Sequence, residues 1–134
     1  MKEFKPVNIQ ITKIQEEKMS ILKGSLLIIP IGINSNPPHE WINFFIDYFN
    51  NPTSFTSHHR PGIANVIGNE IILNGTTVDE IEKCHRTTII EAVNRANESY
   101  NTYKRAEIEK ENQKEEAERR KLSEEQNKAK NIKF

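Results

Sequence analysis

The sequence predicts an α+β fold of the order ββαββα, in which one antiparallel sheet carries two helices packed on one face. Two pairs of strand-like segments, a short aromatic-rich helix between them and a long helical pattern from Thr77 onward lead to this prediction. The long pattern keeps an apolar stripe as far as Tyr103 and then loses it. A helix without a stripe must lie in water or on a polar partner. We therefore expect a compact domain, residues 1–103, and a charged helical extension, residues 104–134.

The first predicted strand pair lies near the N-terminus. Apolar and polar residues alternate from Val7 to Thr12, which is typical of a half-buried strand. The segment Ser20–Ile33 is rich in Ile and Leu and predicts a second, more buried strand that pairs with the first as a hairpin. Within this segment we expect Gly24 to mark a bulge. We expect Pro30 to end the strand or to place it at a sheet edge, because proline cannot donate to a strand ladder.

The first predicted helix is short and buried on most of its circumference. The segment Asn36–Pro38 is a start signal, because Asn caps helices and Pro is tolerated in the first turn. From Trp41 to Asn50 the polar residues form only one narrow strip, at positions 43, 47 and 50. Asn51 and Pro52 stop the helix. Its aromatic side chains either form plain core or line an apolar pocket.

The second predicted strand pair has a clear turn signal. The segments Ile63–Ile67 and Glu70–Leu73 flank Gly68-Asn69, a dipeptide typical of a two-residue hairpin turn. We expect Asn74-Gly75 to end the return strand.

The long helix begins with a capping box over Thr77–Glu80, in which each side chain can satisfy the other residue's backbone N–H. Its apolar stripe predicts packing on the sheet. Residues 104–134 hold ten Lys/Arg and eight Asp/Glu and no heptad pattern, so a sustained coiled coil is disfavoured. Opposite charges instead recur four residues apart, as in Glu116 and Arg120. Such pairs cannot offset the ordering entropy, so we expect the isolated extension to fray and residues 127–134 to be disordered.

The charge balance and the cysteine count exclude several classes of protein. Residues 1–103 hold nine Lys/Arg and eleven Asp/Glu, and the whole chain is neutral. No single-sign basic face is apparent, so neither nucleic acid nor a membrane surface is an expected partner. Cys84 is the single cysteine, which rules out an internal disulfide and suits a reducing compartment. The sequence shows no signal-peptide pattern and no membrane span, and we expect a cytoplasmic protein.

Two short motifs carry potential chemistry. His58, His59 and Arg60 lie together in a polar loop, and Arg86 is able to join them from the second helix as an anion-binding or phosphate-binding site. The alternative is a solvated loop without a ligand. In the second motif, Cys84-His85-Arg86, neighbouring side chains point about 100° apart on an α-helix and form no site by themselves.

A buried thiol and a histidine at the edge of the core are the favoured interpretation of the second motif, over a cysteine nucleophile. The histidines, the cysteine and the nearby acids show no metal-ligand spacing, so the sequence predicts neither a metal nor a cofactor.

No catalytic constellation emerges from the sequence, and an enzyme is not the preferred interpretation. Our first hypothesis is a non-enzymatic module for protein–protein interaction or self-association, which uses the charged extension. The alternative is a small-ligand or anion-binding domain, or a weak enzyme, with its site at His58, His59 and Arg60.

Overall fold

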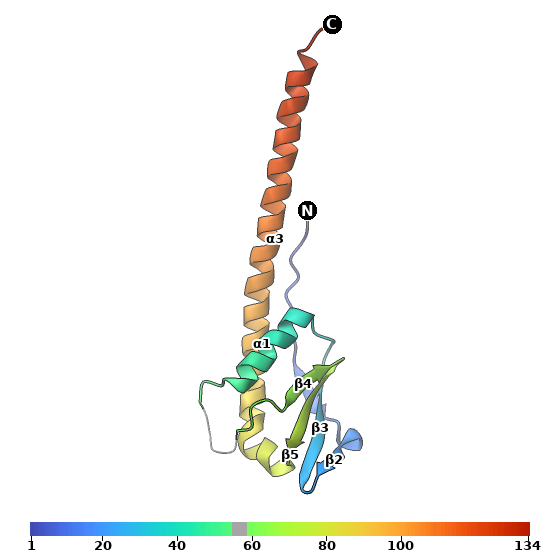
Figure 1. The fold of residues 1–134 in the computed structure, drawn as a ribbon, viewed down its shortest axis with the longest axis vertical. Helices are drawn as coiled ribbons and strands as arrows, with labels where there is room; N and C mark the ends of the chain where they lie inside the picture. Colours follow the sequence, from blue (N-terminus) through green and yellow to red (C-terminus); the bar gives the residue numbers. More distant parts are fainter. Residues whose placement is uncertain (55–58) are drawn as a thin grey trace. The chain divides into compact units, whose positions relative to one another are not determined.

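The computed structural model describes residues 1–54 and 59–134, and within them it confirms the predicted α+β class (Figure 1). The described strands form one antiparallel sheet of five. The elements in chain order are β1 (Ile11–Ile14), the 3₁₀ turn η1 (Glu16–Lys18), β2 (Ser20–Lys23), β3 (Leu26–Ile33), α1 (His39–Asn50), β4 (Ala64–Ile67), β5 (Glu70–Thr76), α2 (Val78–Glu80), the π-helical turn η2 (Ile81–His85) and α3 (Arg86–Lys130). The last three are continuous and form one helix of 53 residues.

The strand order of the sheet is β1-β3-β5-β4, and β2 also pairs with β3. The first predicted strand does pair antiparallel with β3, but it spans Ile11–Ile14 and not the expected Val7–Thr12. The predicted strand Ser20–Ile33, however, is divided into β2 and β3. Gly24 has a positive φ of 59° in the turn between them, so it makes a hairpin turn and not the expected bulge.

Pro30 lies inside a central strand, contrary to the expectation of a strand end or a sheet edge. It pairs with Ile72 of β5 on one side of β3, and its carbonyl accepts a hydrogen bond from the Gln15 N–H on the other side at 2.9 Å. A strand residue directs its N and its C=O to the same side. The missing N–H of Pro30 therefore faces the break between β1 and β2, where no ladder bond is lost.

Gly75 is likewise inside a strand and does not end it. Thr76 pairs with Leu27 and Asn74 pairs with Ile28, so Gly75 is an extra residue in β5. Its φ of 102° lies in the region that glycine tolerates and other residues avoid. The Asn74-Gly75 dipeptide is therefore a bulge, which carries β5 three residues beyond its expected end.

One face of the sheet carries the core and both helices, as predicted (Figure 1). Alternate residues of β3, β5 and β4 point to this face; they are Ile29, Ile31, Ile33, Ile71, Leu73, Ala64 and Val66. Helix α1 begins after Pro38 without a side-chain cap and ends at Asn50. Its Trp41, Phe45 and Phe49 are each 0% exposed, four residues apart, so this stripe is core.

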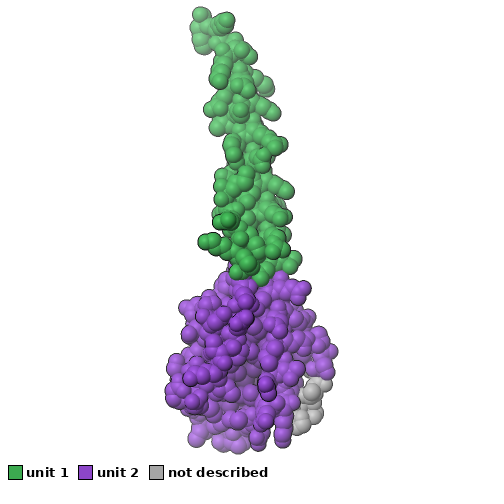
Figure 2. All heavy atoms as spheres, turned by 180° about the vertical axis from the view of Figure 1, so that it is seen from behind, with its two compact units in different colours: residues 1–6, 101–134 green, residues 7–100 purple. Residues whose placement is uncertain are grey.

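The chain divides into two compact units, which Figure 2 colours separately. We call residues 7–100 the body and residues 101–134, together with residues 1–6, the arm unit. The arm unit contains the distal part of α3 and the N-terminal segment. Asn112 exchanges two hydrogen bonds with the backbone of Lys2, at 3.0 and 2.9 Å, and the Lys2 ammonium lies 2.7 Å from Glu111. The guanidinium of Arg105 lies 4.7 Å from the ring centre of Phe4. Nothing in the sequence pattern predicted this pairing.

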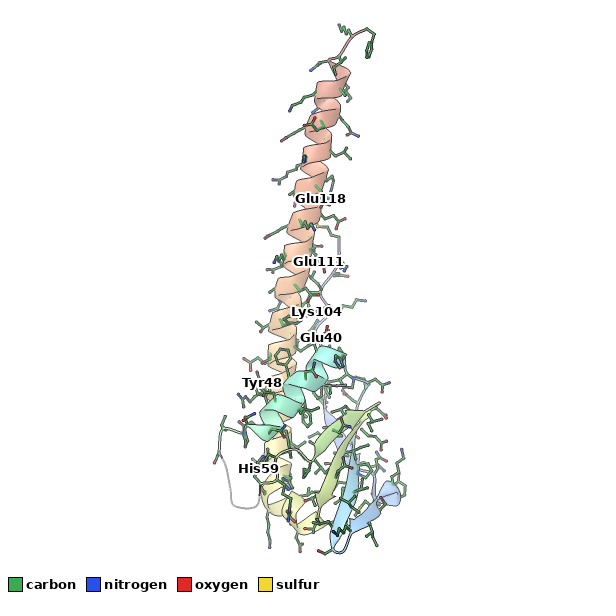
Figure 3. The ribbon with its side chains drawn as sticks, in the orientation of Figure 1. Glu40, Tyr48, His59, Lys104, Glu111 and Glu118 are labelled. Atoms are coloured by element: carbon green, nitrogen blue, oxygen red, sulfur yellow. The ribbon has the colours of Figure 1, made fainter. Side chains whose placement is uncertain are left out.

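Within the arm unit, the distal part of the helix, beyond the pairing with the N-terminal segment, is exposed (Figure 3). Every residue from Ala117 to Phe134 is exposed, and α3 continues to Lys130. Residues 127–130 are thus helical where the sequence predicted disorder. The expected Glu116–Arg120 pair forms at 2.8 Å, whereas Lys128 contacts Glu125 at 3.5 Å. Among the helices of the described residues, none combines the length and apolar character that crossing a bilayer requires.

Candidate functional site

Three side chains with metal-binding or nucleophilic chemistry meet in the body. His59 immediately precedes the segment that leads into β4, whereas Cys84 and His85 belong to η2 at the start of the long helix. One donor atom from each residue lies within 4.8 Å of the other two. Figure 3 shows His59 near the end of α1. We call these three residues the His-Cys-His cluster.

The π-helical turn explains why neighbours on a helix share one site. The Arg86 N–H bonds to the carbonyl of Ile81, five residues earlier, instead of to a carbonyl four residues earlier. A turn of this kind is wider and rotates each residue by less than the 100° of an α-helix. The separation of about 100° expected for Cys84 and His85 holds only in a regular α-helix, and the position of His59 beside them depends on tertiary structure. π-turns inside helices occur frequently at functional sites.

His85 lies at the centre of this region and is 0% exposed. Its ring centre is 6.0 Å from that of Phe49 and 6.0 Å from that of His59. Neither ring nitrogen of His85 has a hydrogen-bond partner among the described residues. The nearest carboxylate oxygen, Oε2 of Glu80, is 3.9 Å from Nε2 and thus beyond hydrogen-bond distance. A buried polar atom without a hydrogen-bond partner costs about 1–3 kcal/mol of folding free energy. A ligand bound to a His85 nitrogen would remove this cost.

Arg60 forms a bidentate contact with the carboxylate of Glu80. Its Nε donates to Oε2 of Glu80 at 2.6 Å, and its Nη2 donates to Oε1 at 3.1 Å. These hydrogen bonds, and then the charge of Glu80, raise the pKa of Arg60 above its ordinary value. The predicted N-cap holds Glu80 in place, since the Glu80 N–H donates to Oγ1 of Thr77 at 3.2 Å. An incoming anion would therefore compete with a bidentate carboxylate for the Arg60 guanidinium.

The structure does not bring together the whole predicted anion site. His58 lies outside the described residues. His59 and Arg60 are adjacent, but the His59 ring lies against Phe49, with ring centres 5.2 Å apart and planes tilted by 52°, while Arg60 reaches Glu80. Arg86 is exposed and lines a separate cavity that neither His59 nor Arg60 lines.

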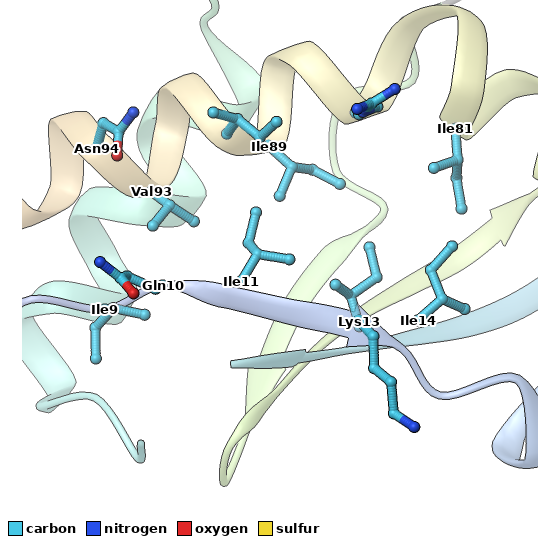
Figure 4. Close-up of a pocket in the computed structure, with 12 residues that line it drawn as sticks. Ile9, Gln10, Ile11, Lys13, Ile14, Ile81, Ile89, Val93 and Asn94 are labelled. Carbon is cyan, nitrogen blue, oxygen red and sulfur yellow. The ribbon is translucent and has the colours of Figure 1, made fainter. Parts of the chain in front are cut away.

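That separate cavity is an apolar groove of about 470 Å³ between β1 and the long helix (Figure 4). Isoleucines dominate its lining; they are Ile9, Ile11, Ile14, Ile31, Ile81, Ile89 and Ile90. In Figure 4, Ile11 and Ile14 of the first strand face Ile81 and Ile89 of the helix. Trp41 does not line this groove. Of the two alternatives for the aromatic side chains of α1, core or pocket lining, the fully buried Trp41, Phe45 and Phe49 are core.

Burial controls the charge state of the two histidines in the cluster. Desolvation lowers the pKa of His59, partly offset by a hydrogen bond that involves the backbone of Phe49. Desolvation also lowers the pKa of His85. The charge of Glu80 acts in the opposite direction, and His59 and Arg60 add to the lowering. Both imidazoles are therefore neutral in the folded chain at neutral pH, as metal ligation requires.

These shifts predict that the protein loses stability below pH 6.5. The unfolded chain recovers a histidine pKa of about 6.5, so it binds protons that the folded chain does not bind. The free energy of unfolding should be constant above that pH and should fall as the pH drops toward the folded pKa values. We expect chemical denaturation from pH 8 to 5, with a chelator present, to show this decline. His85→Asn should flatten it and His39→Gln, at an exposed histidine, should not. A decline equally steep in His85→Asn would contradict the assignment.

No protein-family model, curated protein or solved structure matches the chain, so the geometry of the residues carries the functional argument. The sequence favours His59 as an anion ligand, and it favours a buried thiol and a core-edge histidine for Cys84 and His85. Both of the latter side chains are buried. The sequence does not predict that the three residues converge. The sequence does place histidines before the second predicted hairpin and a cysteine with a histidine after it. This pattern points to a shared site only once the hairpin is known to pack against the long helix.

Proposed function

We propose that this chain is a non-enzymatic, cytoplasmic interaction module that self-associates through the distal helix of its arm unit. One observation carries the proposal: residues 117–130 are helical, yet every one of them is exposed. Isolated helices of this length are marginal in water, because nucleation and chain ordering outweigh their side-chain pairs. A second helix that covers these residues would provide the missing stabilisation.

The charges of the distal helix support a second copy of the chain as the partner. Residues 107–118 hold six Glu and two Lys, a net charge of −4. Residues 119–130, the remainder of the helix, hold five Lys/Arg and two Glu, a net charge of +3. Glu111 and Glu118, labelled in Figure 3, belong to the acidic block. A helix with an acidic block followed by a basic block of similar charge is complementary to itself.

The block order also selects an orientation. Two parallel helices in register would place like charges opposite each other, which is destabilising. Two antiparallel helices that cross near residues 118 and 119 would place each acidic block opposite the partner's basic block, as a two-fold symmetric interface requires. Because these charges are exposed, such an association should weaken as salt is raised.

A charge-reversal pair of variants tests this proposal. The first variant changes Arg119, Arg120 and Lys121 to Glu, and the second changes Glu115, Glu116 and Glu118 to Lys. Each variant removes six favourable ion pairs from a symmetric dimer. At about 0.5 kcal/mol for each pair, self-association should weaken about 100-fold. An equimolar mixture of the two variants should associate again. The first variant's helix is then net negative and the second variant's helix is net positive, so the two helices attract each other. Sedimentation velocity in the presence of a chelator measures the association of the wild type, of each variant alone and of their mixture.

A matched control changes Lys13, Lys23 and Lys83 to Glu, three exposed residues of the body, and should associate like the wild type. The proposal fails if the wild-type chain is monomeric at low salt over the whole concentration range. It also fails if the mixture of the two variants associates no better than either variant alone.

A further inference from the structure

We infer that the His-Cys-His cluster is a binding site for one transition-metal ion of the zinc class. His59, Cys84 and His85 would supply two imidazole nitrogens and one thiolate sulfur. The inference is independent of self-association by the distal helix, since all three residues belong to the body.

The spacing of the donor atoms is close to what a metal needs. They lie within 4.8 Å of one another without an ion. Zinc binds imidazole nitrogen at about 2.0–2.1 Å and thiolate sulfur at about 2.3 Å, so tetrahedral ligands stand about 3.5 Å apart. Side-chain rotations that move each donor atom by about 1 Å would bring the donor atoms from within 4.8 Å to about 3.5 Å of one another. The backbone already brings the segment before β4 and the π-helical turn together.

The donor types decide which metals fit. Thiolate and imidazole favour Zn²⁺ and its chemical relatives, whereas Mg²⁺ and Ca²⁺ prefer oxygen ligands. Cys84 is the chain's single cysteine, so a disulfide within the chain cannot compete for its sulfur. Three protein ligands leave the fourth tetrahedral position for water or an external ligand, the arrangement of open zinc sites.

The surroundings of His85 give an independent reason for a ligand. Its ring is fully buried, and neither nitrogen has a hydrogen-bond partner among the described residues. A metal ion on one nitrogen would leave the other to donate to Oε2 of Glu80, which is now 3.9 Å from Nε2. A carboxylate behind a ligating histidine is a typical outer partner. Arg60 fixes that carboxylate through its two hydrogen bonds.

Cobalt and zinc titrations of the full-length protein test the site. Co²⁺ should bind one ion per chain and produce thiolate-to-cobalt charge-transfer absorption, which Zn²⁺ then abolishes by displacement. Free Zn²⁺ at about 100 times its Kd should raise Tm by about 10 °C. The absorption band reports the Cys84 ligand directly, so it separates this site from histidines at the surface.

Three variants complete the test, each checked for its fold by circular dichroism. Cys84→Ala should remove the charge-transfer band, and both Cys84→Ala and His59→Ala should weaken Zn²⁺ binding at least about 100-fold. Cys84→Ser replaces Cys84→Ala if the latter does not fold. His39→Ala, at an exposed histidine of α1, should bind like the wild type. The inference is overturned if Co²⁺ gives no thiolate band, or if His39→Ala weakens binding as much as His59→Ala does.

Discussion

Replacing Trp41 with Ala is expected to lower the free energy of unfolding by about 3–5 kcal/mol, the largest effect predicted for this chain. Trp41 is 0% exposed, and its ring stacks on that of Phe45 with centres 5.4 Å apart and planes 2° from parallel. Its Nε1 donates to Oδ1 of Asn97 at 2.9 Å. The substitution removes a large apolar contact area, leaves a cavity and breaks one hydrogen bond.

Urea denaturation followed by circular dichroism measures this loss. Trp41→Phe keeps most of the ring contact and should cost less than half as much as Trp41→Ala. Asn43→Ala is the matched control, because Asn43 is exposed on the same helix and should change stability by less than about 0.5 kcal/mol. If the free energy of unfolding of Trp41→Ala is within about 1 kcal/mol of the wild-type value, the packing of α1 on the sheet is wrong.

Asn97→Ala should destabilise the body by about 2–4 kcal/mol, the second largest expected loss. The Asn97 side chain accepts from the Ile9 N–H at 3.0 Å and donates to the Ile9 carbonyl at 2.9 Å, in addition to accepting from Trp41. One amide thus joins the backbone just before β1, α1 and the long helix. Its removal leaves the buried indole N–H and the Ile9 backbone without these partners, at about 1 kcal/mol or more each.

Asn94→Ala provides the comparison, since Asn94 is exposed one turn earlier on the same helix and Ala has the higher helix propensity. It should be neutral or slightly stabilising. A double-mutant cycle of Trp41→Phe with Asn97→Ala should show a coupling of about 1 kcal/mol, because the two residues share a hydrogen bond. Additive effects would mean that this bond contributes nothing measurable.

Local signals in the sequence predicted most of the elements correctly. Gly68-Asn69 makes the second hairpin turn, Thr77 caps the long helix, and the polar strip of α1 leaves the Trp41–Phe49 stripe for the core. These features depend on residues within a few positions of each other. Backbone φ, capping and periodicity therefore determine them before any tertiary contact forms.

The candidate site was only partly predictable. The sequence predicts His59 as a ligand of an anion, whereas for Cys84 and His85 it favours a buried thiol and a core-edge histidine. Their convergence depends on a π-turn at η2 and on the path of the chain from α1 to β4. A single additional residue in a helical turn changes the direction of the side chains, and no periodicity argument detects it in advance.

The sequence by itself determined the fold class, the second hairpin turn and the aromatic core stripe. Only the tertiary structure decided that Pro30 sits beside a break in the neighbouring strands, that Gly75 bulges within β5, that Lys2 pairs with Asn112 and that a buried histidine meets a thiol. The physical reason is the range of the interactions. Propensity and periodicity act between near neighbours, whereas these four features depend on which distant backbone or side chain arrives beside the residue.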